Sequence, residues 1–273
     1  MAAFFDIQSV VVVFLVALGT ALATGLGALP FLFVRNMSVR SIALASGLAA
    51  GFMIGASIGL GFEGATHSVY QMVGGLGIGY FGISLSMRLI DRWNVGPVTG
   101  NSIAPVDTSG LTISEEIAAV RRSASMFSAG MRIVLIMTIH SFSEGVGIGV
   151  GWGGGKSFGV LVAIAIAVHN IPEGLAISVA LVARGASVGR AAWMSIVSSL
   201  PQPLMAVPAF IFVESFSSLL PWGLGFAAGA MLWMTFSDLL PDAVAGAGVR
   251  LTAAAACISA VIMVIFQVKL LPS

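Results

Sequence analysis

The sequence predicts an all-α, polytopic membrane protein. Three observations carry this prediction: an apolar composition, eight continuous hydrophobic segments, and the concentration of lysine and arginine on alternate connections between them. Hydrophobic residues make up 58% of the 273 residues and charged residues 8%, against about 45–50% and about 25% in soluble domains. A transmembrane β-barrel would instead show alternating segments of about ten residues.

Each hydrophobic segment is long enough to cross a membrane, because a spanning helix needs about 20 mostly apolar residues. In chain order, the predicted spans cover residues 8–33, 41–62, 72–90, 130–152, 158–183, 190–213, 217–240 and 250–270. No positively charged signal-peptide segment precedes the first span in this sequence, so we expect that span to be retained. In the second span, glycines recur at intervals of four residues, which favours close helix packing: Gly47, Gly51, Gly55 and Gly59.

Positively charged residues predict the orientation. The connections after spans one, three, five and seven carry Arg35, Arg40, Arg88, Arg92, Arg121, Arg122, Arg132, Arg184, Arg190 and Arg250. The other side has only Lys156 and Lys269. Because cytoplasmic loops are enriched in lysine and arginine, we expect both termini to face outside in a plasma or bacterial inner membrane.

The chain contains one long connection, residues 91–128, between spans three and four. It is rich in proline, asparagine and serine, and the arginine distribution predicts that it is cytoplasmic. The capping-box spacing of Thr112 and Glu115 predicts a short helix before span four. Residues 1–273 are therefore predicted to form a single transmembrane domain with one cytoplasmic loop.

Two consecutive spans contain the same local motif, a histidine followed four residues later by a glutamate and a glycine. The first copy extends from His140 to Gly145 and the second from His169 to Gly174. Residues four apart are separated by about 40° around a helix, so each histidine shares a face with its glutamate. An ionisable side chain at the bilayer centre costs at least about 2.5–3.5 kcal/mol, which makes such residues candidates for function.

These motifs point to a divalent metal site if their helices face each other. The convergent side chains would then be four strong ligands and two weaker ones: His140, Glu144, His169 and Glu173, with Ser141 and Asn170. Nitrogen and oxygen donors of this kind suit zinc and similar transition metals, whereas imidazole argues against magnesium or calcium. The only cysteine, Cys257, excludes a cluster of thiolate ligands. The alternative for either motif alone is a buried His–Glu pair that only holds helices together.

The phrases HSFSEG at residues 140–145 and HNIPEGLAIS at residues 169–178 resemble the signature of the ZIP (Zrt/Irt-like protein) family of divalent metal transporters. The resemblance implies a homodimer with a mobile four-helix transport unit and no prosthetic group. The implied cargo is Zn²⁺, with Fe²⁺, Mn²⁺ and Cd²⁺ as other candidates. The positions that match the family's central metal site are His140, Glu144, His169, Asn170 and Glu173. The two glutamates would be able to bridge two metals.

Two positions in this region depart from the family pattern. Gln202 stands in span six where the family usually has a metal-binding glutamate, and Ser141 stands where asparagine or aspartate is common. The second metal position therefore loses an anionic ligand. Whether the centre takes one metal or two stays open at this point.

Further ionisable residues lie at the predicted membrane edges. Glu63 and His67 end span two on the predicted outer side, and Asp238 and Asp242 end span seven on the inner side. A solvated helix end is the alternative for both pairs. Because Asp238 lies deeper in an apolar segment whose ending resembles that of the family, we expect it to bind metal. The opposite placement of the two pairs also fits an inverted repeat of spans one to three and six to eight, in a 3+2+3 bundle.

Together these features predict transport of zinc or a similar divalent cation toward the cytosol, by alternating access between the two edge pairs. The expected partners are the cation, the lipid bilayer and a second copy of the chain, and the net charge of +1 argues against nucleic acid. An intramembrane zinc hydrolase is the alternative, but the sequence has no HExxH motif, so the chain is not expected to be an enzyme. A metal sensor would need a soluble output domain, for which residues 91–128 are too short.

Overall fold

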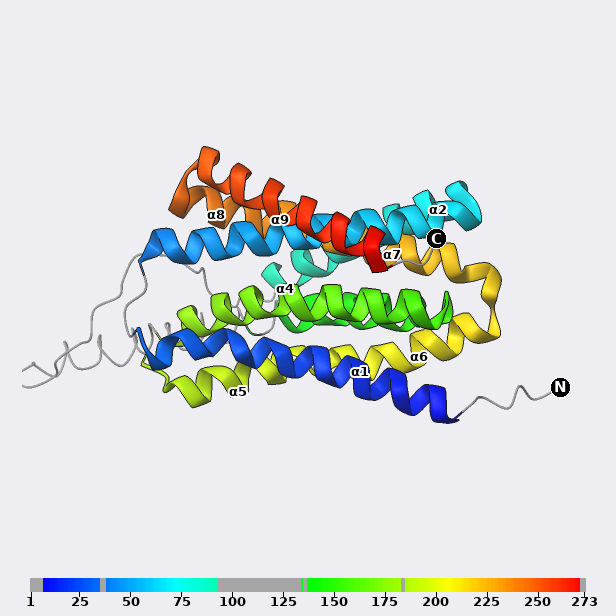
Figure 1. Ribbon diagram of the computed structural model, residues 1–273, viewed down its shortest axis with the longest axis horizontal. Helices are drawn as coiled ribbons and strands as arrows, with labels where there is room; N and C mark the ends of the chain where they lie inside the picture. Colours follow the sequence, from blue (N-terminus) through cyan, green and yellow to red (C-terminus); the bar gives the residue numbers. More distant parts are fainter. Residues whose placement is uncertain (1–6, 35–37, 93–133, 135–136, 183–184, 271–273) are drawn as a thin grey trace, which may run out of the picture.

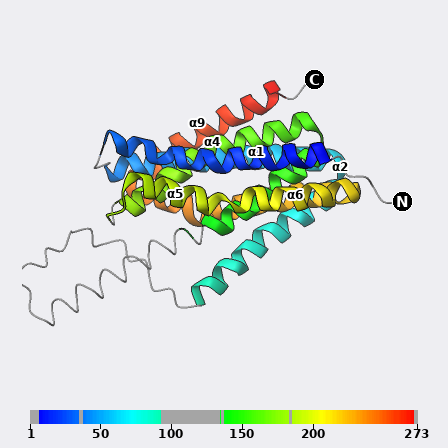
Figure 2. The ribbon, with the colours of Figure 1, turned by 90° about the horizontal axis from the view of Figure 1, so that it is seen from below.

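The computed structural model describes residues 7–34, 38–92, 134, 137–182 and 185–270. Within these ranges the regular elements are helices, most of which extend along the long axis of the molecule (Figures 1 and 2). The predicted all-α fold is thus confirmed. The loop at residues 91–128 is outside the described residues from residue 93 onward, as is the expected short helix near Thr112.

The helices follow the hydrophobic segments of the sequence. In chain order they are α1 (Ile7–Gly25), η1 (Leu26–Leu32), α2 (Val39–Arg92), α4 (Lys156–Val182), α5 (Val188–Ser199), α6 (Pro201–Ser215), η2 (Ser217–Leu219), α7 (Leu220–Met234), η3 (Thr235–Leu239), α8 (Leu240–Ala247) and α9 (Val249–Leu270). A further helix covers residues 137–153, between α2 and α4. Pro201 begins α6, because a proline is well tolerated in the first turn of a helix.

Six helical segments of the described chain are long and apolar enough to cross a membrane, against eight predicted spans. One of them, Val39–Leu89, has 51 residues and would extend about 75 Å as a straight helix, more than twice the hydrocarbon thickness of about 30 Å. Its backbone leaves the helical conformation at Ser68, with φ −165° and ψ 110°. Helix 137–153, in the fourth predicted span, is not among the six.

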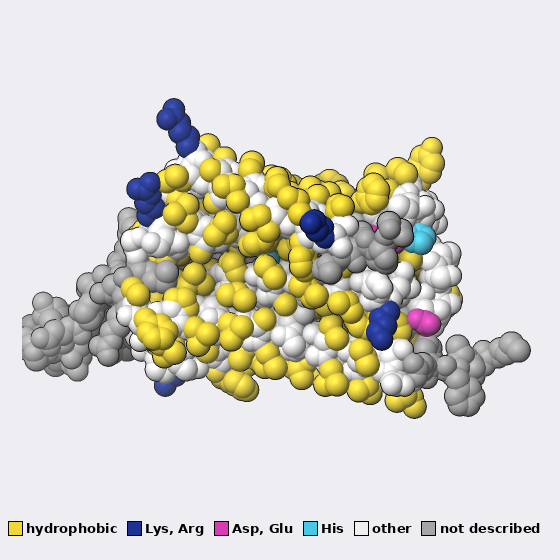
Figure 3. Space-filling view, viewed as in Figure 1, with side chains coloured by type: hydrophobic (Ala, Val, Ile, Leu, Met, Phe, Trp, Pro, Cys, Tyr) yellow, Lys and Arg dark blue, Asp and Glu magenta, His cyan; other side chains and the backbone are white. Residues whose placement is uncertain are grey.

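Hydrophobic side chains cover most of the molecular face shown in Figure 3, as expected for a surface in contact with lipid. α2, α5 and α9 begin at one end of the bundle, where Arg40, Arg190 and Arg250 lie in their first turns (Figure 1). α4 begins at the opposite end with Lys156, and α9 ends there, next to Lys269. These five basic residues therefore separate into an arginine end and a lysine end. Arg35, Arg121, Arg122, Arg132 and Arg184 lie outside the described residues.

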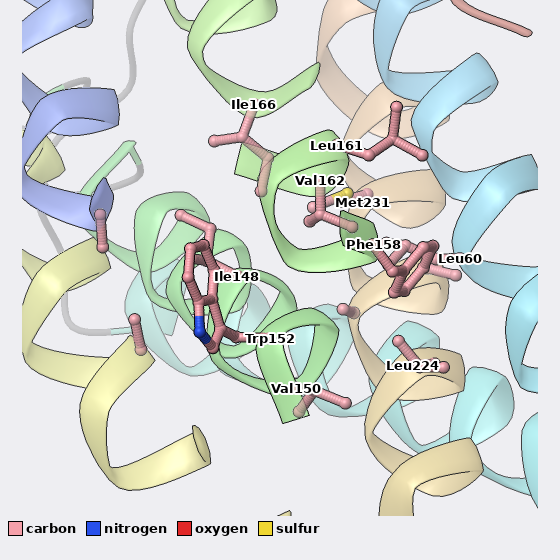
Figure 4. Packing of buried hydrophobic residues seen from close by; sticks show 14 of the residues in the cluster. Leu60, Ile148, Val150, Trp152, Phe158, Leu161, Val162, Ile166, Leu224 and Met231 are labelled. Atoms are coloured by element: carbon pink, nitrogen blue, oxygen red, sulfur yellow. The ribbon is translucent and has the colours of Figure 1, made fainter. Parts of the chain in front are cut away.

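The helices pack in two groups. α1 contacts α4, α5 and α6, whereas α2 contacts α7, α8 and α9; α2 also packs against α4 and so connects the groups. The largest buried cluster extends over both, with Ile148 and Leu161 from one side and Leu60, Leu224 and Met231 from the other (Figure 4). Burial of these side chains holds the central helices in contact.

The glycine stripe of the second span packs against α9. A Cβ atom on Gly55 would lie 2.6 Å from the Cβ of Met263, and one on Gly59 would lie 2.5 Å from the Nε2 of Gln267. Gly47 and Gly51 likewise face α9. The stripe is therefore a close helix contact within one chain, as the spacing favoured.

Candidate metal centre

The structure brings together the four side chains that the two motifs single out. His140 and Glu144 lie on helix 137–153, and His169 and Glu173 lie on α4. All four are buried, and one possible ligand atom from each lies within 4.8 Å of the others. The two imidazole rings have their centroids 6.5 Å apart and are inclined at 78°. The four side chains form a compact group that could hold a metal ion once its ligand atoms move slightly closer together.

The histidines converge on Glu144. Its Oε1 contacts His169 Nε2 and lies 3.2 Å from His140 Nε2, which is also 3.7 Å from Glu173 Oε2. Both carboxylate oxygens of Glu173 and the Oδ1 of Asn170 are buried without a hydrogen-bond partner among the described residues. Leaving a buried polar group unpaired costs about 1–3 kcal/mol. These oxygens are therefore available for a cation, which would remove that cost.

Each motif ends in glycine because the backbone of another helix lies directly beside its glutamate. A Cβ on Gly174 would overlap the main-chain oxygen of Thr24 in α1, and a Cβ on Gly145 would lie 2.5 Å from the main-chain oxygen of Gln202 in α6. A side chain at either position would push α1 or α6 outward. The glycines thereby let Thr20 and Gln202 reach the centre.

A hydrogen-bond network borders the centre where α1 and α6 approach it. The amide nitrogen of Gln202 donates to Glu144 Oε2 at 2.6 Å. The Thr20 hydroxyl donates to Gln202 Oε1 at 2.5 Å, and the Asn170 amide nitrogen donates to the same oxygen at 3.3 Å and to the main-chain oxygen of Thr20 at 2.8 Å. Three helices, α1, α4 and α6, thereby contribute to holding one glutamate of helix 137–153.

Ser141 is a candidate ligand that the structure places away from the four His and Glu side chains. Its hydroxyl donates to Ser199 Oγ at 3.5 Å, and Ser199 also accepts from Thr24 at 2.9 Å. This contact is with α5 rather than with a carboxylate or an imidazole. Although Ser141 is adjacent to His140 in sequence, its position on the helix turns it toward a different neighbour.

Asp238 lies on the other side of the centre, in the π-helical turn η3 between α7 and α8. Such turns often occur at functional sites. Asp238 lines a cavity of about 10 Å³ together with His140, His169 and Glu173, and this volume is close to the minimum that one water molecule needs. Asp238 is thus the candidate ligand that adjoins the centre from the second group of helices.

A second cavity, of about 600 Å³, lies next to the first. Met137, Asp238 and Leu239 line both. The larger cavity is also lined by Asp242 and by Val39, the first residue of α2, so it extends toward the arginine end of the bundle. Asp238 therefore lies between the His/Glu group and a cavity that leads to this end.

The Glu63 and His67 pair, which the sequence predicts at the outer edge, is separate from this centre. Glu63 and His67 lie one helical turn apart, with Oε1 and Nε2 3.6 Å from each other and side chains 23% and 45% exposed. They precede the break of α2 at Ser68. Their exposure agrees with the alternative of a solvated helix end.

Two features of the centre were missed by the sequence analysis. Thr20 was not selected, although Thr20 and Thr24 are polar residues four positions apart in the apolar middle of the first span, and this was the available signal. Met53, Met137 and Met234 line the small cavity, but with 13 methionines in the chain their spacing carried no pattern. Their placement depends on the packing of three separate helices.

Comparison with known proteins gives a consistent picture. The profile of the ZIP zinc transporter family matches residues 109–266. A candidate zinc transporter of Arabidopsis thaliana is 41% identical over 254 residues, which is 92% of this chain but 38% of that protein. The zinc transporter ZupT of Akkermansia muciniphila is 30% identical over 246 residues, 86% of this chain and 88% of ZupT. The zinc transporter GufA of Myxococcus xanthus is 29% identical over 222 residues, 81% of this chain and 84% of GufA.

Fold and site together define a multi-pass integral membrane protein with a buried group of His and Glu side chains suited to a cation. The family profile covers more than half of the chain, and the chain covers most of the two bacterial relatives. The chain belongs to the ZIP zinc transporter family, as the motif resemblance implied. Nothing in the comparisons supports the hydrolase alternative. The chain spans little more than a third of the Arabidopsis relative.

Proposed function

We propose that the chain carries a divalent transition-metal cation, with Zn²⁺ as the first candidate, across a membrane toward the cytosol. The proposed ligands are His140, Glu144, His169, Asn170 and Glu173. The observation that carries the proposal is the approach of four buried ligand atoms to within 4.8 Å of one another. Imidazole nitrogen and carboxylate oxygen are common zinc ligands. Fe²⁺, Mn²⁺ and Cd²⁺ share enough of this chemistry to be tested beside zinc.

The two glutamates give the proposed site its charge. Glu144 and Glu173 are buried and, when ionised, together neutralise one divalent cation. Charge neutralisation matters because an uncompensated ion inside the membrane is costly. Ligands must lose their protons before they bind metal, so metal binding releases protons and protonation favours metal release.

The cavity arrangement supports a release path toward the arginine end. Asp238 lies between the His/Glu group and the cavity of about 600 Å³, whose lining includes a second carboxylate, that of Asp242. Positively charged residues are enriched on the cytoplasmic side of membrane proteins, so we assign the arginine end to the cytosol. In this conformation the larger cavity would then lead to the cytosol, and Asp238 would receive the ion from the centre.

We also propose eight spans with both termini outside. The break of Val39–Leu89 at Ser68 divides that segment into two spans, and helix 137–153 adds another, which brings six candidates to eight. The start of α1 and the end of α9 lie at the lysine end (Figure 1), in support of exterior termini in a plasma or bacterial inner membrane. The 3+2+3 inverted repeat and a single transport domain over residues 1–273 belong to the same proposal.

The two helix groups suggest how access alternates. α1, α4, α5 and α6 pack together, so with helix 137–153 they form a unit that would carry the site past α2, α7, α8 and α9. A homodimer, implied by the family resemblance, completes this proposal. Mass measurement of the protein in lipid nanodiscs would test the dimer.

Uptake of radiolabelled ⁶⁵Zn²⁺ by proteoliposomes tests the central proposal. Glu144→Ala and Glu173→Ala should each abolish uptake while the protein remains folded and inserted, because each change removes a ligand and a neutralising charge. Glu214→Ala is the matched control, since Glu214 is an exposed residue near the end of α6. Near-normal uptake by either site variant at equal protein levels would exclude that residue from the site.

A further inference from the structure

Gln202 is a completely buried amide whose orientation is set by its neighbours. Its Oε1 lies 2.5 Å from the Thr20 hydroxyl, whose one proton is shared with Ala17 O, and it accepts an N–H from the Asn170 amide at 3.3 Å. Because the Asn170 NH₂ group can only donate and a carboxylate can only accept, the NH₂ group of Gln202 points away from Asn170. It points at Glu144 Oε2, 2.6 Å away.

This hydrogen bond makes the two oxygens of Glu144 unequal. Oε1 faces His140 and His169, whereas Oε2 accepts the N–H of Gln202. A metal on the Oε2 side would have to share that oxygen with the amide N–H and would lie beside an NH₂ group, which has only donors to offer. The amide therefore disfavours a second metal at Oε2, and Glu144 faces the histidines and one metal through Oε1.

Asn170 is oriented by the same network. Its amide nitrogen donates to Thr20 and Gln202, and its buried Oδ1 has no hydrogen-bond partner in the part of the chain that the structure describes. A carbonyl oxygen can ligate a cation, whereas the NH₂ group cannot. Gln202 thus selects the face that Asn170 presents to the centre.

Charge leads to the same conclusion. Glu144 and Glu173 carry two negative charges when ionised and balance one divalent cation. A second cation would leave a net charge of +2, or of +1 if Asp238, which lines the adjoining cavity, is counted as well. Charges at this depth interact strongly, because little water screens them.

We propose that Gln202 is a positioning residue that makes this a one-metal centre. Its amide stands where a second cation would bind and holds Glu144 as a ligand through one oxygen. This inference rests on the proposed function, since it assumes that the four His and Glu side chains bind the transported ion. The substitution Gln202→Glu would add a carboxylate beside Glu144, and the repulsion between the two would favour a second cation.

The test is metal stoichiometry of the purified full chain in detergent, measured by equilibrium dialysis with Zn²⁺ or Cd²⁺ followed by elemental analysis. We expect one metal per chain in the unmodified protein and two in Gln202→Glu. In parallel, ¹¹³Cd NMR should show one resonance for the unmodified protein and two for the variant. Gln267→Glu is the matched control, because it places the same new carboxylate at another buried glutamine, in α9, and should still bind one metal.

A second pair of variants tests the positioning without adding charge. Thr20→Val removes a donor that orients Gln202 and should weaken Cd²⁺ affinity at least threefold at unchanged stoichiometry, whereas Thr20→Ser should restore the affinity. Two metals in the unmodified protein, one metal in a folded Gln202→Glu variant, or unchanged affinity in Thr20→Val would each overturn the inference. If the unmodified protein bound no metal at this centre, the proposed function itself would fail.

Discussion

At the scale of the residue, the chemistry of the centre depends on groups that bind either a proton or a metal. His140 and His169 are buried next to Glu144, and each must be deprotonated at the nitrogen that ligates. Protons therefore compete with the cation. The outcome can be measured at equilibrium, separately from transport.

We predict that metal affinity falls as the pH drops from about 7.5 to about 5.5, the range in which histidine commonly titrates. His140→Ala and His169→Ala should each weaken Zn²⁺ binding by at least about tenfold and flatten the pH dependence, because each loses a ligand and a proton acceptor together. Isothermal titration calorimetry in detergent measures both effects. His67→Ala, at the exposed outer pair, should retain the affinity and pH slope of the unmodified protein. An affinity that is constant over this pH range would refute the ligand set.

Asp238 allows binding to be separated from release. It lines both the small cavity of the centre and the cavity that extends to the arginine end, and it is not part of the group of His and Glu ligand atoms around Glu144. We predict that Asp238→Asn slows Zn²⁺ transport at least about tenfold, while the equilibrium affinity for Zn²⁺ changes less than about threefold. The reason is that a charge at the edge of a binding site mainly affects the rate at which the ligand enters or leaves. Paired uptake and calorimetric measurements check this. A parallel loss of affinity would make Asp238 part of the primary site instead.

At the scale of the element, the close contact of α1 and α6 with the two motif helices determines which side chains reach the metal centre. Gly145 and Gly174 lie where α6 and α1 come into backbone contact with the motif helices. The small residue is needed because there is no room for a Cβ atom, not because of an unusual backbone conformation. Thr20 and Gln202 can reach the centre only while α1 and α6 stay in close contact with the helices that carry Gly174 and Gly145.

We predict that Gly174→Ala destabilises the protein by about 1–3 kcal/mol, as overpacking commonly does, and also lowers metal affinity. The added methyl group would overlap the Thr24 carbonyl and displace α1 with Thr20. Thermal unfolding in detergent with and without Zn²⁺ measures both effects. Gly77→Ala is the control, because a Cβ there meets no atom of the described residues within 4 Å. Equal melting temperatures for the two variants would contradict the close contact.

At the scale of the whole molecule, the charge distribution predicts which end faces the cytosol. Arg40, Arg190 and Arg250 lie at one end, and Lys156 lies at the other. Such segregation orients helical membrane proteins during insertion. The orientation in turn determines whether the cavity of about 600 Å³ is an inlet or an outlet.

The orientation can be tested by labelling intact cells. In a Cys257→Ser background, which removes the only native cysteine, Lys156→Cys should react with a membrane-impermeant maleimide from outside. Ser187→Cys, at the start of α5 at the arginine end, should react only after permeabilisation. The reverse pattern would invert the proposed direction of release.

The sequence by itself was sufficient for properties that depend on local order. Long apolar segments predicted helices, and the four-residue spacing from His140 to Glu144 and from His169 to Glu173 predicted a shared face, because the helical repeat is the same in any surroundings. The prediction of a divalent transition metal followed from the imidazole and carboxylate groups of these residues. The glycine stripe of the second span was recognisable for the same reason.

Only the tertiary structure decided how each helix is rotated and which backbone lies beside it. Ser141 and Asn170 hold equivalent places in the two motifs, yet Ser141 contacts Ser199 in α5 while Asn170 joins Thr20 and Gln202. The position of Asp238 between two cavities likewise depends on a π-turn and on the packing of α2, α4 and α8. Helix association within lipid depends on close packing between separate segments rather than on hydrophobicity. The pattern of residues along one segment therefore does not identify the segments that pack against it.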